Sequence, residues 1–151
     1  NGEGFAFSIE CFLCAKKVAV GQRHVYHYRV GDPNTGASVF KKEYINSSID
    51  AQQYIKSIFK NPSNELLTAW NFSNWHTHCD AFNVIIGCSA QYQEPELYKS
   101  IRLFCKKNAG CAFKAPIAIQ QKLRGVMFSI NPDFAAKVIN LFRIRKFKKV
   151  K

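Results

Sequence analysis

Hydrophobic and polar residues change their spacing about a third of the way along this 151-residue chain. Before that point they alternate, loosely over residues 4–20 and strictly over residues 23–30. Alternation with a period of two is typical of a half-buried β-strand. We therefore expect two strands within 4–20, joined by a turn at Cys11-x2-Cys14, and single strands over 23–30 and 39–45.

From about residue 47 the apolar residues recur at helical spacing, and capping residues mark where helices start. Ser63 or Asn64 is expected to cap one helix, and Asn131, Pro132 and Asp133 form the start signal of the last. The expected helices span residues 48–59, 63–87, 95–107, 115–130 and 131–149. The predicted fold class is therefore α+β, with a β-rich N-terminal third followed by about five helices.

Composition agrees with a single domain over residues 1–151, because hydrophobic residues make up 47% of the chain. Such a content is enough to build a core against the entropy of ordering the chain. No run approaches the roughly 18 uninterrupted apolar residues that would indicate a membrane-spanning helix.

The formal net charge of +12 is concentrated at the C-terminal end. Residues 114–151 hold ten Lys/Arg against one Asp, which gives +9, and residues 1–113 hold twelve against nine, which gives +3. A basic end on a nearly balanced body indicates a polyanionic partner, with nucleic acid first and an anionic membrane or an acidic protein second. A solubilising tail would have the same composition. The cations expected to contact phosphates are Arg143, Arg145, Lys146, Lys148, Lys149 and Lys151.

Two Cys/His groups carry the candidate metal chemistry. A structural Zn²⁺ takes four thiolate or imidazole ligands in a tetrahedron. Cys11 and Cys14 have the spacing of a zinc knuckle, and His76 and Cys79 share one face of a helix. We therefore expect a structural Zn²⁺ held by Cys11, Cys14, His76 and Cys79, with His78 as an alternative ligand. The metal would make residues 1–90 a zinc-stabilised α+β core, followed by a helical part over 91–151 with a basic end.

The stretch "NWHTHC", residues 74–79, is similar to the W-H-x-x-C end of the zinc fingers in poly(ADP-ribose) polymerases. The resemblance covers Cys11, Cys14, Trp75, His76 and Cys79. It implies a type of site, in which a knuckle and the start of a helix each give two ligands, and it implies no family.

The same cysteines allow other interpretations. The CxxC pair could be a redox dithiol, Cys11 could form a disulfide with Cys79, or all of these thiols could be free. Cys88, Cys105 and Cys111 are expected to be buried free thiols, although a disulfide that clips the loop between Cys105 and Cys111 is also allowed.

The favoured function is that of a zinc-stabilised basic protein that binds DNA or RNA through phosphates without sequence specificity, inside the nucleus or a virion. The first alternative is a structural or assembly protein, such as a virion component, with a Phe-rich surface against partner subunits or further copies and a basic tail that faces the genome. The second alternative is a secreted, basic, disulfide-containing effector or ribonuclease. A binding protein is favoured over an enzyme, because no metalloprotease, P-loop, nucleophile-elbow or zinc-deaminase motif occurs.

Overall fold

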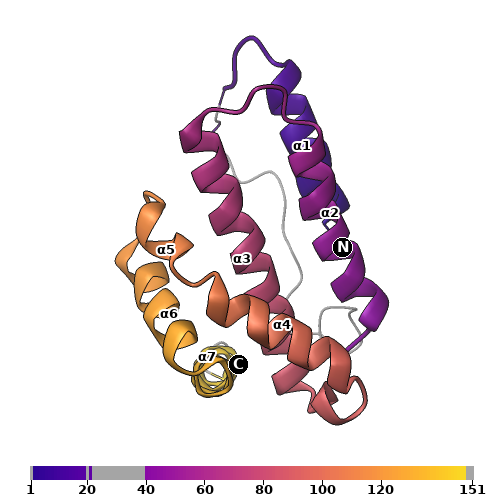
Figure 1. Cartoon of the computed structure of the whole chain (residues 1–151), viewed down its shortest axis with the longest axis vertical. Helices are drawn as coiled ribbons and strands as arrows, with labels where there is room; N and C mark the ends of the chain where they lie inside the picture. Colours follow the sequence, from indigo (N-terminus) through magenta and orange to yellow (C-terminus); the bar gives the residue numbers. More distant parts are fainter. Residues whose placement is uncertain (1, 20, 22–39, 149–151) are drawn as a thin grey trace. The chain divides into compact units, whose positions relative to one another are not determined.

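The chain divides into two compact units, Asn1–Phe59 and Lys60–Lys151. The expectation of a single domain stays a prediction. The computed structural model describes residues 2–19, 21 and 40–148, with side chains placed as far as Arg143. The first unit contains α1 (Glu3–Cys14) and α2 (Lys42–Ser57). The second contains α3 (Asn64–Gly87), the 3₁₀ turn η1 (Ala90–Tyr92), α4 (Pro95–Lys107), α5 (Cys111–Lys114), α6 (Ile119–Ile130) and α7 (Pro132–Lys148), as Figure 1 shows.

The α+β prediction is wrong, because the described residues contain helices and no strand. The segment expected to form a strand and a knuckle is α1, and the segment expected as a strand over 39–45 opens α2. The strand expected over 23–30 lies outside the described residues. Short apolar runs fit both periods: Ala6 and Ile9, three residues apart, also form the inward side of a helix.

Within the first unit, α1 packs against α2 through a close approach at Gly2. This glycine has a φ of 97°, and a Cβ there would lie only 2.8 Å from the Cβ of Ala51. Both facts require glycine, since side chains rarely adopt that conformation and there is no room for one. The Tyr54 hydroxyl also donates a hydrogen bond from α2 to the Glu10 carboxylate of α1.

Both capping predictions in the second unit are confirmed. Ser63 caps α3, since its Oγ accepts from the backbone N–H of Leu66 at 3.2 Å. Asn131 caps α7, since its Oδ1 accepts from the N–H groups of Asp133 and Phe134 at 3.0 and 3.2 Å. Asn131 also ends α6, because its own N–H donates to the Met127 carbonyl at 3.0 Å. One residue therefore closes one helix and opens the next.

The expected helix over 115–130 differs from the structure at its start. Helix α6 begins at Ile119, and Pro116 lies in the connection that precedes it. The four-residue helix α5 stands immediately before this connection and was not expected from the sequence. Helices α3 and α4 have the expected bounds to within one residue.

Aromatic side chains form the core of the second unit, around α3, which runs through its middle (Figure 1). Trp75 and Phe82 on α3 and Phe128 on α6 are all fully buried. The Phe128 ring meets the Trp75 ring edge-on at 5.9 Å between centroids. Trp75 Nε1 donates to the Cys105 carbonyl of α4 at 2.9 Å, so the indole N–H is satisfied inside the core. This cluster joins α3, α4 and α6.

Helix α6 approaches α5 closely at Gly125. A Cβ at this position would lie 2.8 Å from the Cβ of Ala112 and 3.3 Å from the Ala109 carbonyl oxygen. Neither neighbour is the end of a flexible side chain, so the backbones would have to separate. The absence of a side chain at Gly125 is therefore a packing requirement.

We predict that Gly125→Ala lowers the free energy of unfolding by about 1–3 kcal/mol through overpacking, in spite of the ~1 kcal/mol that alanine gains in helix propensity. The measurement is urea unfolding followed by circular dichroism. Gly110→Ala is the control, because no heavy atom lies within 4 Å of a Cβ there and φ needs no glycine. Equal stability of the two variants would contradict the packing argument.

Candidate functional site

The structure does not support a zinc site, which corrects the metal prediction. Among the described residues no three His, Cys, Asp or Glu side chains come together as metal ligands would. Cys11 and Cys14 are exposed on the continuous helix α1, so the turn of a zinc knuckle is absent. The CxxC spacing here places two thiols on one helical face and does not mark a metal.

His76 is engaged by charged side chains from α3 and α6. Arg124 Nη1 donates to His76 Nε2 at 2.8 Å. A guanidinium can only donate, so Nε2 accepts, and the ring proton lies on Nδ1, which faces Asp80 Oδ2 at 3.4 Å. Both ring nitrogens are thus occupied, and a cation stands where a metal would bind. Both nitrogens of the imidazole therefore have protein partners in this structure.

Asp80 is the centre of this network, which we call the Arg124 clasp: His76, Asp80, Arg124 and Arg143. Arg124 Nη2 donates to Asp80 Oδ1 at 2.8 Å, and Arg143 Nη2 of α7 donates to the same oxygen at 3.4 Å. Burial lowers the pKa of His76, and the neighbouring arginines lower it further, although Asp80 opposes them. The clasp ties α6 and α7 to α3 with a neutral histidine inside it.

The other predicted or alternative ligands are core residues. His78 is buried, stacks on Phe104 at 3.8 Å between ring centroids, and its Nδ1 donates to the Asn74 carbonyl at 2.8 Å. Burial lowers the pKa of His78. Cys79 is buried beside the Cys105 thiol, and burial raises the pKa of Cys79. These groups stabilise the packing of α3 on α4.

The remaining cysteines differ in how deeply they are buried. Cys88 is exposed at the end of α3, which contradicts its expected burial. Cys105 is buried as expected, and Cys111 is half-buried at the start of α5. All six cysteines are free thiols.

The expected phosphate-binding cations are described only in part. Arg143 is exposed but pairs with Asp80, so it belongs to the clasp. Arg145, Lys146 and Lys148 lie in the last turns of α7, with side chains outside the described part. Lys149 and Lys151 fall outside it altogether. Phosphate binding by these residues stays an untested prediction.

The surface feature that stands out is an apolar stripe on α6, formed by Ile119, Leu123, Val126 and Ile130. These side chains are between 39% and 71% exposed. At 3.6 residues per turn they lie within about 60° of one another, on the side opposite the buried Gly125 and Phe128. Helix α6 thus has two apolar sides, and one of them has no partner in the described structure.

Helix α7 repeats the arrangement. Phe134 and Leu141 are 61% and 58% exposed, with the half-buried Val138 between them, and the buried Ala135 and Ala136 face inward. The spacings of four and three residues are those found on α6. We call the two stripes together the α6–α7 surface: Ile119, Leu123, Val126, Ile130, Phe134, Val138 and Leu141.

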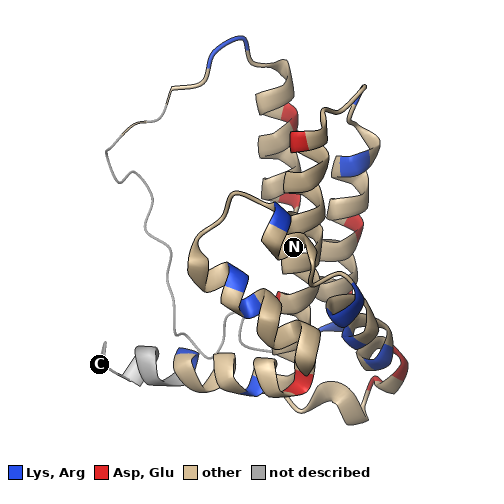
Figure 2. Cartoon of the chain, turned by 60° about the vertical axis from the view of Figure 1, so that its left-hand side comes forward, with Lys and Arg blue, Asp and Glu red and all other residues tan. Residues whose placement is uncertain are grey.

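The α6–α7 surface is flanked by cations. Lys122 lies beside the α6 stripe and Lys137 beside the α7 stripe, each at the position before an apolar residue. Asp133 is the only acidic residue on these two helices (Figure 2). It is already paired, since Arg102 Nε and the Tyr98 hydroxyl of α4 both donate to it at 2.6 Å. The surface therefore presents apolar contact area with positive charge around it.

The surface is held rigidly from behind. The Arg124 clasp holds α6 and α7 on α3, and Asp133 holds the start of α7 on α4. Asn140 Nδ2 donates to the Asn83 carbonyl of α3 at 2.9 Å, which holds the middle of α7. The exposure of the two stripes is consequently a property of well-packed helices and does not reflect loose packing.

The sequence analysis did not identify this surface, because it assigned no exposed face to the helix expected over residues 115–130. The signal was present in α6, where apolar residues occupy two opposite sides around Gly125. A helix with only one neighbouring layer needs only one such side.

Comparison with known proteins gives no further information on the site, since no family model, curated protein or solved structure matches the chain. No helix within the described ranges combines the length and apolar character needed to cross a bilayer. The nucleic-acid-binding and viral classes expected with the zinc site receive no support from these comparisons.

We predict that stability falls as the pH decreases below about 6.5. The pKa values of His76 and His78 are lowered by burial, so between their folded values and ~6.5 the unfolded chain binds more protons than the folded one. The free energy of unfolding then decreases by up to about 1.4 kcal/mol per pH unit for each histidine. The measurement is urea unfolding at pH values above and below 6.5.

His76→Gln separates this effect from other titrations, because it removes one of the two groups and should reduce the pH dependence. The lowered pKa values of Asp133 and Glu65 place their titration at more acidic pH. Stability that rises on acidification would contradict a neutral histidine in the clasp.

Proposed function

We propose that the chain is a protein-binding module that docks an acidic helical segment of another protein on the α6–α7 surface. The observation that carries the proposal is the exposed stripe of α6, repeated on α7, on helices fixed from behind. Exposed apolar side chains that are flanked by polar residues are typical of interaction sites. The proposal follows the assembly alternative raised by the sequence.

The spacing supports a helical partner. Ile119, Leu123, Val126 and Ile130 are four, three and four residues apart, which is the spacing of the a and d positions of a heptad. A stripe this narrow matches the contact line between two helices. Helices that lie on a membrane carry a wider apolar face with many cations on the opposite side, whereas the opposite side of α6 is packed in the core.

Charge supports an acidic partner. Lys122 and Lys137 flank the stripes, and no unpaired carboxylate lies on α6 or on the described part of α7. A partner with Glu or Asp beside its apolar positions would complement this rim and associate faster. A second copy of the chain fits less well, because each copy carries a net charge of +12.

The probe for this proposal is a set of designed amphipathic peptides with Leu at a and d positions and Glu at the flanking positions. Fluorescence anisotropy with the full chain is expected to detect binding that weakens as salt is added. Peptides with Lys in place of Glu are expected to bind much more weakly.

Leu123→Gln is predicted to weaken peptide binding by about tenfold, since a central apolar contact is removed. The change should alter stability by no more than about 0.5 kcal/mol, since Leu123 is exposed. Leu103→Gln is the matched control, because Leu103 lies on α4 outside the surface and is 67% exposed, against 56% for Leu123.

Two experimental outcomes would contradict the proposal. In the first, the chain binds anionic phospholipid vesicles or a random duplex oligonucleotide but no acidic peptide. That result would indicate membrane or phosphate binding and contradict the docking of a helix. In the second, Leu123→Gln and Leu103→Gln weaken peptide binding equally. That result would show that the peptide does not bind at the α6–α7 surface.

A further inference from the structure

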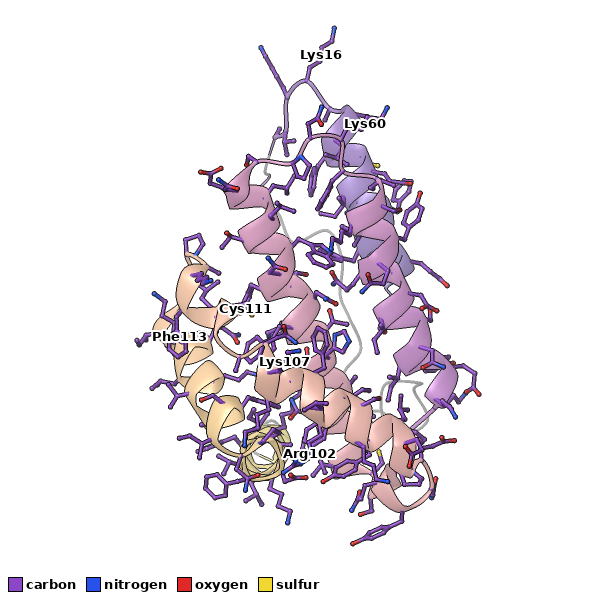
Figure 3. The ribbon with its side chains drawn as sticks, viewed as in Figure 1. Lys16, Lys60, Arg102, Lys107, Cys111 and Phe113 are labelled. Atoms are coloured by element: carbon purple, nitrogen blue, oxygen red, sulfur yellow. The ribbon has the colours of Figure 1, made fainter. Side chains whose placement is uncertain are left out.

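A cavity of about 490 Å³ opens to solvent between α3, α4 and α5, away from the residues of the α6–α7 surface. This volume lies in the range of small-molecule sites. Figure 3 labels two of its lining residues, Lys107 at the end of α4 and Cys111 at the start of α5, and both lie near the middle of α3. Neither the clasp nor the proposed docking surface uses this cavity.

Positive charge dominates the lining. Lys107 and Lys114 line the cavity, and no carboxylate does. Burial raises the pKa of the Cys111 thiol to about 11, so this side chain is neutral at physiological pH. Two ammonium groups without a counter-charge favour an anion, and phosphate is the group that lysine binds well as a compact point charge.

Two asparagines of α3 belong to the wall of the cavity, Asn71 and Asn74. Asn74 is only 6% exposed, and its Oδ1 is buried without a partner among the described residues. This oxygen has less than 1 Å² of accessible surface, so it lies behind the wall and a ligand in the cavity does not reach it. Asn71, one turn earlier on α3, supplies a second amide to the same lining.

Aromatic side chains supply the apolar part of the wall. Trp70 and Phe104 both line the cavity. The Phe104 ring is held in place by His78, which stacks on it. The backbone carbonyl of Phe104 is already satisfied, because it accepts from both the backbone N–H and the side-chain amide of Asn108. Fixed aromatic rings of this kind contact flat ligands.

We infer that this cavity binds a small phosphorylated ligand with a flat nitrogen heterocycle, of the class of the nucleoside monophosphates. The phosphate lies between Lys107 and Lys114, and an N–H group of the ring pairs with the exposed side-chain amide of Asn71, as exocyclic amines of bases do with asparagine. The heterocycle contacts Trp70 and Phe104.

The test is a ¹H–¹⁵N NMR titration of the full chain with adenosine 5′-monophosphate. Shifts are expected at Asn71, Asn74, Lys107 and Gly110. Purine riboside 5′-monophosphate, which lacks the exocyclic amine, is expected to bind about fivefold more weakly, since the hydrogen bond to the Asn71 amide is lost. Adenosine and ribose 5-phosphate, each with half of the recognised groups, are expected to bind more weakly than the whole nucleotide.

Lys107→Ala and Lys114→Ala are each expected to weaken nucleotide binding about threefold or more and to leave adenosine binding unchanged. Lys106→Ala is the matched control, since Lys106 is exposed one residue earlier on α4 and does not line the cavity. All three lysines are exposed, so folding is retained. Absence of shifts at millimolar nucleotide, shifts elsewhere, or equal effects of Lys106→Ala would overturn the inference. These outcomes leave the docking proposal untouched, because no residue is shared.

Discussion

The structure of the second unit depends on one guanidinium. Arg124 reaches from α6 to α3 and donates to His76 and Asp80 through two different nitrogens. The contact selects the neutral tautomer of His76, draws Arg143 of α7 onto the same carboxylate, and fills the position that a metal would need. It also fixes the rotation of α6 about its own axis. With Arg124, Gly125 and Phe128 turned inward, the apolar residues on the other side of α6 have to face solvent.

The sequence alone predicts a helix cap where one side chain makes it. The hydroxyl of Ser63 and the amide of Asn131 satisfy helix N–H groups through bonds to residues two or three positions away, so the sequence alone indicates them. The bounds of α3 and α4 follow from such caps and from long helical periodicity. The N-terminal third was predicted wrongly because its apolar runs are short and fit either period.

The site could not be predicted for a different reason. Whether His76 and Cys79 bind a metal depends on what lies opposite them, and their neighbours Arg124 and Cys105 come from other helices. Likewise an apolar residue on α6 is core or surface according to the rotation of the helix, which Gly125 and Arg124 decide through tertiary contacts. The cavity lined by Asn74 and Lys107 brings together residues from three helices, none of which has a recognisable spacing.

Asn131 gives the second unit a property that neither helix has alone. Because this residue ends α6 and begins α7, no free chain lies between the two helices, and the angle between them cannot be adjusted by a flexible loop. The direction of α7 is therefore set by how α6 is seated together with the bonds of Asp133, Asn140 and Arg143 to α4 and α3. A change in the orientation of α6 would therefore strain the bonds that hold α7, so the two helices respond to a perturbation as one unit.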